Sequence, residues 1–341
     1  MNRSDLPGLD LERLRGHLDR ALPGLVAGPL RGELIPGGRS NLTYLVTDGS
    51  RRWVVRRPPL GHVLATAHDM AREHRVIGAL GSTPVPVPTP LLLCEDPDVI
   101  GAPFYVMEYV PGTPYRKKEQ LAALGPERTR AIVLSLVDTL VTLHAVDPEA
   151  VGLGDFGRPR GFLERQLARW AKQLAASRSR EVPGIDELHE QLAASVPVSP
   201  PPAIVHGDYR LDNVLVDGDD RITAVLDWEM STLGDPLTDL ALLVAYSTRA
   251  LHEGDSPVSD ASAAPGYPDA TELVARYAER SRRDLSRFPW YVAFAFYKLA
   301  VILEGIHYRF AQGMTVGAGF DRVGELVAPL VAHGHAALKE D

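Results

Sequence analysis

The chain has 341 residues, of which 45% are hydrophobic and 23% are charged, and this predicts a globular protein of about two domains. Its net charge of −8 argues against non-specific nucleic-acid binding, and its single cysteine excludes disulfide scaffolds and Cys-based metal sites. The N-terminus lacks the apolar segment of a secretory signal, and the longest apolar run, Trp290 to Leu303, contains Lys298 and is too short for a bilayer. We expect a cytoplasmic protein without nucleic-acid or membrane partners, and the oligomeric state stays open.

The first third of the chain is predicted to be rich in β-strands. In chain order, the pattern predicts a helix at 9–22, strands at 42–46 and 53–55 around an Asp48-Gly49 turn, a helix at 64–80, an extended proline connector at 84–88, and strands at 91–94 and 104–109. Helical patterning dominates afterwards, with one strand-like stretch at 203–228. This predicts an α+β chain with a β-rich domain at 1–110 and a mainly helical domain at 111–341.

A polar loop inside that strand-like stretch carries the most informative motif. His206-Gly207-Asp208 follows a strand, Asn213 precedes the next one, and Asp227 ends the strand at 222–226. The intervening hairpin is expected to bring Asp208, Asn213 and Asp227 together. Their oxygen atoms suit Mg²⁺, and one carboxylate remains to orient or deprotonate an attacking hydroxyl, as phosphoryl transfer requires. The alternative, a polar turn bonded to its own backbone, fits Asp217 better.

These residues resemble a known signature. His206-Gly207-Asp208, Asn213 and Leu226-Asp227-Trp228-Glu229 look like the motifs of aminoglycoside phosphotransferases and their choline-kinase-like relatives, and residues 234–241 match the same superfamily. The resemblance runs from about residue 30 to the C-terminus. It implies a bilobal protein-kinase-like fold that uses ATP and Mg²⁺.

The resemblance also implies a role for each matching residue. Asp208 would be the catalytic base, and Asn213 and Asp227 would hold the magnesium. His206 would brace the loop, and Asp239 would anchor its backbone from within the second domain.

The phosphate-binding groups are expected in the first domain. A turn that contains Gly38 and Ser40 lies where the family has its phosphate-covering hairpin, although an ordinary turn is an equal alternative. Arg56 occupies the strand position of the family's phosphate-binding lysine, and Glu73 on the following helix would be its partner. Strand alternation sends Arg57 to the opposite face.

Adenine is expected at the end of the β-rich domain. By resemblance, residues 107–110 are the hinge, where the backbone of Glu108 and Val110 would pair with the base. Asp155-Phe156-Gly157 spells the magnesium tripeptide of protein kinases, but it precedes Asp208 and receives no metal role. The chain contains no G-x-x-x-x-G-K-[ST] motif, which excludes a P-loop NTPase.

The acceptor region is predicted to be basic. Residues 151–180 carry seven basic side chains and two acidic ones, and Arg165, Arg169 and Lys172 share one helical face. Together with Arg309, they form a possible rim for an anionic acceptor, although a solvated helix face is an alternative. Polycationic aminoglycosides would instead require carboxylates.

A closer resemblance agrees with that charge. Residues 56–59, 100–108 and 298–313 look like the kinase-like domain fused to, or encoded beside, acyl-CoA dehydrogenases, a group in which arginine at position 56 is usual. This implies phosphorylation of a hydroxyl on a small-molecule acceptor, a hydroxyacyl-CoA or a similar anionic metabolite. The alternatives are an aminoglycoside O-phosphotransferase and a non-catalytic nucleotide-binding pseudokinase. The presence of a base, Asp208, argues against the second.

Overall fold

The computed structural model describes residues 6–36, 41–61, 68–248, 259–314 and 320–340. The chain forms two compact units. The N-terminal unit comprises Met1–Pro111 together with Thr223–Ser231, and the C-terminal unit comprises Gly112–Ile222 and Thr232–Asp341. The segment that contains Asp227 therefore groups with the N-terminal unit, although it lies far along the chain.

The N-terminal unit is built on one antiparallel sheet. Its elements are α1 (Leu11–Ala21), β1 (Arg31–Leu34), β2 (Leu42–Thr47), β3 (Arg52–Arg57), α2 (Met70–Leu80), β4 (Pro90–Cys94) and β5 (Phe104–Glu108). The strand order is β1-β2-β3-β5-β4, and Val55 pairs with both Tyr44 and Val106. The predicted hairpin around Asp48-Gly49 is confirmed, because β2 and β3 pair antiparallel on either side of it. The Asp48 carboxylate accepts the amides of Ser50 and Arg51 within the turn.

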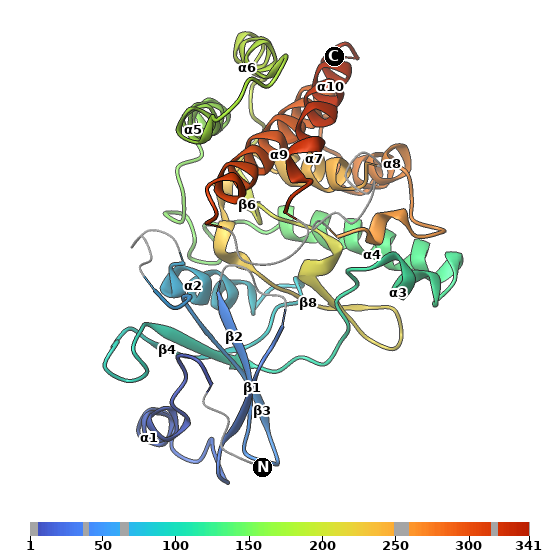
Figure 1. The fold of residues 1–341 in the computed structure, drawn as a ribbon. Helices are drawn as coiled ribbons and strands as arrows, with labels where there is room; N and C mark the ends of the chain where they lie inside the picture. The colour runs from blue at the N-terminus through green and yellow to red at the C-terminus, as the bar shows by residue number, and fades with distance from the viewer. Residues whose placement is uncertain (1–5, 37–40, 62–67, 249–258, 315–319, 341) are drawn as a thin grey trace. The chain divides into compact units, whose positions relative to one another are not determined.

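The two faces of the sheet pack against different helices (Figure 1). Trp53 and Val55 lie in one apolar cluster with Leu14 and Leu18 of α1, and α2 packs on the other side against β4 and β5. The alternation of side chains along β3 continues into the two arginines that end it. The Arg57 guanidinium donates to the carbonyl of Ile100 (2.9 Å) on the α1 side, as the sequence predicted.

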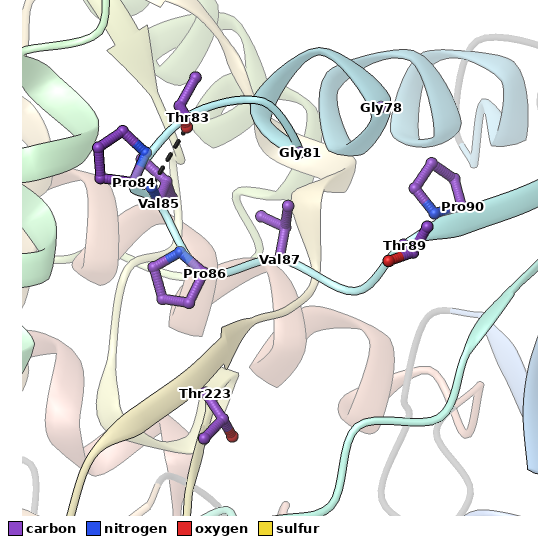
Figure 2. Close-up of a pocket in the computed structure, with 10 residues that line it drawn as sticks. All are labelled: Gly78, Gly81, Thr83, Pro84, Val85, Pro86, Val87, Thr89, Pro90 and Thr223. Atoms are coloured by element: carbon purple, nitrogen blue, oxygen red, sulfur yellow. Dashed lines mark hydrogen bonds between the residues drawn. The ribbon is translucent and has the colours of Figure 1, made fainter.

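The proline connector is extended and borders a cavity of about 570 Å³ (Figure 2). The cavity is lined by Gly78 and Gly81 at the end of α2, by residues 83–87, 89 and 90, and by Thr223. The Thr83 hydroxyl accepts the amide of Val85 (3.2 Å), and the Pro86 carbonyl accepts the amide of Val225 (2.8 Å) at the end of β8 (Ile222–Val225). Because proline has no amide hydrogen, Pro86 contributes only its carbonyl to these contacts.

The C-terminal unit is mainly helical. Its elements are α3 (Lys118–Ala122), α4 (Pro126–His144), α5 (Phe162–Ser177), α6 (Ile185–Ala194), β6 (Ala203–Val205), β7 (Val214–Val216), β9 (Thr232–Gly234), α7 (Leu237–Tyr246), α8 (Ala270–Ser281), α9 (Phe288–Ala311) and α10 (Val327–Leu338). Strands β6 and β9 pair antiparallel, with Ile204 opposite Leu233. This short pair supports the start of the polar loop that carries Asp208.

Helix α9 is the central element of this unit and packs against α5, α6, α7 and α10. The apolar run at 290–303 is part of a longer helix of 24 residues, so the expectation that it is too short to cross a membrane was wrong by length. The most apolar window of α9 is 72% buried inside the protein. Its composition is therefore that of a core helix, hydrophobic on nearly all sides.

Candidate active site

The polar loop is anchored by a buried carboxylate. Asp239, in the first turn of α7, accepts the amides of His206 (2.7 Å) and Gly207 (2.8 Å), and His144 Nε2 lies 3.3 Å from the same side chain. Burial by itself raises the pKa of Asp239, but the bonds from His144 and the His206 amide outweigh it and lower the pKa overall. Asp239 thus makes the contacts that its predicted anchoring role requires.

Asp208 is held at both carboxylate oxygens. The Tyr246 hydroxyl donates to Oδ1 (3.0 Å), and Asn213 Nδ2 donates to Oδ2 (3.0 Å) and to the Asp208 carbonyl (2.9 Å). The Asp208 amide donates to Nδ1 of His206 (3.3 Å), which is fully buried. Burial and the Asp208 charge raise the pKa of Tyr246, so its hydroxyl stays a donor.

Tyr246 was missed in the sequence analysis. Its only signal was that it ends the apolar stretch from Leu240 to Ala245 in α7. The structure also shows the Arg210 guanidinium 4.5 Å from the centre of the Tyr246 ring, in the range of a cation–π contact. These contacts give the Asp208 carboxylate a defined orientation, which is what a residue that positions a hydroxyl needs.

The second group of predicted site residues lies in the N-terminal unit, around Arg56. Arg56 Nε lies 3.0 Å from Glu73 Oε2, and its Nη2 donates to Asp227 Oδ1 (2.5 Å). The Tyr105 hydroxyl donates to Glu73 (2.8 Å). Burial alone lowers the pKa of Arg56, but the charges of Glu73 and Asp227 raise it, so the guanidinium stays charged. The expected contact between Arg56 and Glu73 is present.

Two further polar residues extend this cluster. Asn41 Nδ2 donates to Glu229 (3.0 Å), and Asn41 Oδ1 is buried without a hydrogen-bond partner among the described residues. Sequence reasoning missed Asn41 and Tyr105. Asn41 had a signal, since it follows the glycine-containing turn, whereas Tyr105 looked like one more apolar strand residue.

The donor atoms present fit a magnesium ion. Glu73, Asp227 and Glu229 each offer a carboxylate oxygen, and these three atoms lie within 4.8 Å of one another. Asn213 uses its amide nitrogen on Asp208, which leaves the amide oxygen for a cation. Oxygen donors of these kinds are the ones that Mg²⁺ prefers. Asp227 belongs to one unit and Asp208 and Asn213 to the other, so the convergence of all three stays a prediction.

Asp227 has an unusual backbone conformation. Its φ and ψ angles of 65° and 60° lie in the left-handed region, directly before a short 3₁₀ turn at Trp228–Met230. Non-glycine residues adopt this conformation at a cost, and aspartate is among those that tolerate it best. The surrounding structure therefore imposes the direction of this carboxylate.

Glu73 gives the cluster a pH dependence. Burial, opposed by Arg56, raises its pKa from 4.5 to about 7, so stability from this group is complete below about pH 4.5 and is lost as the pH rises through about 7. Between about pH 4.5 and 8, we expect the unfolding free energy of Glu73→Gln to gain about 3 kcal/mol relative to the wild type. Urea unfolding across this range measures it, with the exposed Glu95→Gln as control. Parallel wild-type and Glu73→Gln profiles would contradict it.

Of the remaining residues predicted to bind the nucleotide, the structure describes Glu108 and Val110. Gly38 and Ser40 lie outside the described residues. The Glu108 amide donates to the Thr89 carbonyl (2.9 Å), which leaves the Glu108 carbonyl as the group that could pair with adenine. Val110 follows β5 in an irregular, partly buried segment. The backbone role expected for Glu108 is thus restricted to its carbonyl.

The residues of the predicted basic rim are all exposed, but they differ in whether the protein already binds their charged groups. Arg165, Arg169 and Lys172 are all exposed on α5, and Arg309 is exposed near the end of α9. The Arg165 guanidinium donates to the carbonyls of Arg158 and Arg160, just before α5. Arg165 is therefore engaged by its own chain, and Arg169 and Lys172 are the better candidates for contact with an acceptor.

Several known proteins are similar to this chain in sequence. The model of the APH phosphotransferase enzyme family matches residues 31–280. Acyl-CoA dehydrogenase family member 10 of Mus musculus is 36% identical over 322 residues, which cover 91% of this chain and 30% of the mouse protein. Acyl-CoA dehydrogenase family member 11 of Rattus norvegicus is 35% identical over 336 residues, which cover 95% of this chain and 43% of the rat protein.

The fold of the chain is similar to that of a solved structure. A Ralstonia eutropha protein assigned to the aminoglycoside phosphotransferases has a TM-score of 0.83 at 33% identity, over 97% of this chain and 98% of that one. This likeness confirms the α+β kinase-like fold predicted from the sequence. The chain spans less than half the length of the two acyl-CoA dehydrogenase relatives.

Proposed function

Because the chain belongs to the phosphotransferase enzyme family, we propose that it transfers phosphate from ATP to a hydroxyl group of an anionic metabolite. The acceptor we propose is a hydroxyacyl-CoA. The observation that carries the proposal is the exposed basic face of α5, with Arg169 and Lys172. This local positive charge contrasts with the net charge of −8 and suits phosphate groups on an acceptor.

The relatives support the same acceptor class. The mouse and rat proteins are named acyl-CoA dehydrogenases, and each contains a region similar to this chain within a longer sequence. A kinase that acts on a CoA-linked hydroxyl would share a type of substrate with the activity in those names. An amine-rich antibiotic would instead meet like charge along α5.

The proposed mechanism rests on Asp208. Its carboxylate, oriented by Tyr246 and Asn213, accepts the proton of the acceptor hydroxyl while the hydroxyl oxygen bonds to the γ-phosphorus and the bond to the ADP oxygen breaks. Asn213 and Asp227 would hold Mg²⁺, which when bound neutralises charge on the phosphates. Arg56 would add its permanent charge at the nucleotide side.

ADP release tests the proposal directly. The protein is incubated with Mg·ATP and, side by side, hydroxyacyl-CoAs and aminoglycosides. We expect acceptor-dependent ADP release with a hydroxyacyl-CoA and none above background with aminoglycosides. Turnover of the antibiotics alone would overturn the proposal in favour of an aminoglycoside O-phosphotransferase, and ATP binding without turnover of any acceptor would favour a pseudokinase.

Charge reversal tests the basic face. Arg169→Glu combined with Lys172→Glu is expected to raise KM for the acyl-CoA acceptor about tenfold or more, because attraction to the CoA phosphates becomes repulsion. The KM for ATP should stay within about twofold, since the residues predicted to bind the nucleotide, Arg56 and Glu73, belong to other elements of the chain. Lys339→Glu, exposed beyond α10, is the matched control. Unchanged acceptor kinetics in the double variant would remove the argument.

A further inference from the structure

Lys298 lies next to the proposed catalytic base and belongs to another element. It projects from α9, and its Nζ donates to the Gly207 carbonyl (2.9 Å), in the peptide bond that leads into Asp208. Burial lowers the pKa of Lys298, and the charges of Asp208 and Asp239 oppose this effect only in part. Lys298 thus extends from the core helix α9 and places its ammonium group, with three N–H donors, at the loop that carries Asp208.

The described residues do not use all the donors of this ammonium group. A lysine ammonium carries three N–H donors and no acceptor. Within the described ranges, the Gly207 carbonyl is the one hydrogen-bond acceptor recorded for Lys298. Nζ also lies 5.7 Å from the centre of the Trp170 ring, which contacts its charge but accepts no conventional hydrogen bond.

Trp170 adds a second donor that lacks an acceptor. The side chain is 4% exposed, and its Nε1 is buried without a hydrogen-bond partner among the described residues. Two of the other buried indoles have an acceptor: Trp228 Nε1 donates to the Val225 carbonyl at 3.0 Å and Trp290 Nε1 to the Leu192 carbonyl at 3.1 Å. A buried donor without an acceptor is costly, so its occurrence here marks a place where a ligand can supply one.

From this surplus of donors we propose that Lys298, packed on Trp170, forms the subsite that binds a carbonyl or carboxylate oxygen of the acceptor beside its reacting hydroxyl. The inference rests on the proposed function and deepens it. Asp208 takes the hydroxyl proton, and Lys298 donates to an oxygen a few bonds away on the same molecule. The thioester carbonyl of a hydroxyacyl-CoA and the carboxylate of a free hydroxy acid share this chemistry.

A cationic acceptor is disfavoured at the same place. The Arg169 guanidinium lies 5.5 Å and Lys298 Nζ 5.7 Å from the centre of the Trp170 ring, so two positive side chains border the indole. An ammonium-rich acceptor would have to approach both of them. An oxygen-rich acceptor instead meets N–H donors that have no further protein acceptor among the described residues.

The test compares Lys298→Met with three acceptors: a hydroxyacyl-CoA, the matching free hydroxy acid, and an alcohol of the same length without a carbonyl. We expect KM to rise about 10- to 100-fold for the two carbonyl-bearing acceptors and to change less than about threefold for the alcohol. A rise for the thioester alone, or for the acid alone, identifies which source is bound. Lys339→Met is the control for the loss of one lysine.

Two further measurements separate recognition from support of the loop. Trp170→Phe keeps an aromatic surface under the ammonium group but lacks the indole N–H, and it should raise the same two KM values about three- to tenfold. Lys298→Arg keeps the charge and should recover most of the affinity. An equal loss with all three acceptors, without rescue by arginine, would show that Lys298 only supports the loop and would overturn the proposal.

The outcome stays separable from that of the proposed function. If no acceptor is turned over, calorimetric titration with a saturated acyl-CoA still reports on the subsite, because binding does not need the reacting hydroxyl. Binding that is about tenfold weaker in Lys298→Met supports the subsite, and equal binding in the folded variant overturns it.

Discussion

Asp208→Asn is expected to lower kcat about 10²- to 10⁴-fold with whichever acceptor is turned over, because an amide cannot accept the hydroxyl proton. Asparagine has nearly the same shape and can keep a contact to Tyr246 or Asn213, so the loop should retain its conformation. Coupled measurement of ADP release gives kcat, and calorimetry gives the affinity for ATP, which should change little.

The matched control is Asp217→Asn in the same region of the chain. Asp217 accepts the amides of Asp219 and Arg221 in its own turn, both at 2.9 Å, and has no predicted role in the reaction. Its substitution should leave kcat within about threefold of the wild type. Turnover by Asp208→Asn at the wild-type rate would refute the assignment of the base, whatever the acceptor proves to be.

Asp239→Ala is expected to destabilise the protein by about 3–5 kcal/mol, the largest loss of stability predicted for this chain. The substitution removes the acceptor for two backbone amides, those of His206 and Gly207, and the partner of the buried His144. These groups have no access to water as a replacement, because Asp239 is only 1% exposed. Denaturant unfolding monitored by tryptophan fluorescence measures the change.

A surface ion pair supplies the comparison. Asp186→Ala removes a carboxylate that pairs with Arg178 at 2.5 Å, but both side chains are about half exposed. Pairs of this kind contribute at most about 1 kcal/mol. A loss below about 1 kcal/mol for Asp239→Ala would mean that the loop is held by other contacts, and its anchoring role would have to be abandoned.

Local patterns in the sequence determined much of the fold. The hairpin around Asp48-Gly49 depends on a turn that bonds to its own side chain, and strand alternation alone placed Arg56 and Arg57 on opposite faces. Within the site, Asp208 and Asn213 are five residues apart in one loop, so their contact follows from spacing. The order of the motif residues also indicated the family, because His206, Asp208, Asn213 and Asp227 all stand within about twenty residues of the sequence.

Only the tertiary structure decided which distant side chains complete these local groups. Tyr246 reaches Asp208 from the end of α7, Lys298 reaches Gly207 from α9, and Tyr105 reaches Glu73 from β5. In the sequence each of these is one polar residue in an apolar segment, and periodicity does not say which neighbour it meets. The packing of helices and sheets sets that choice, because it determines which buried donor finds an acceptor and which, like the Trp170 indole, is left for a ligand.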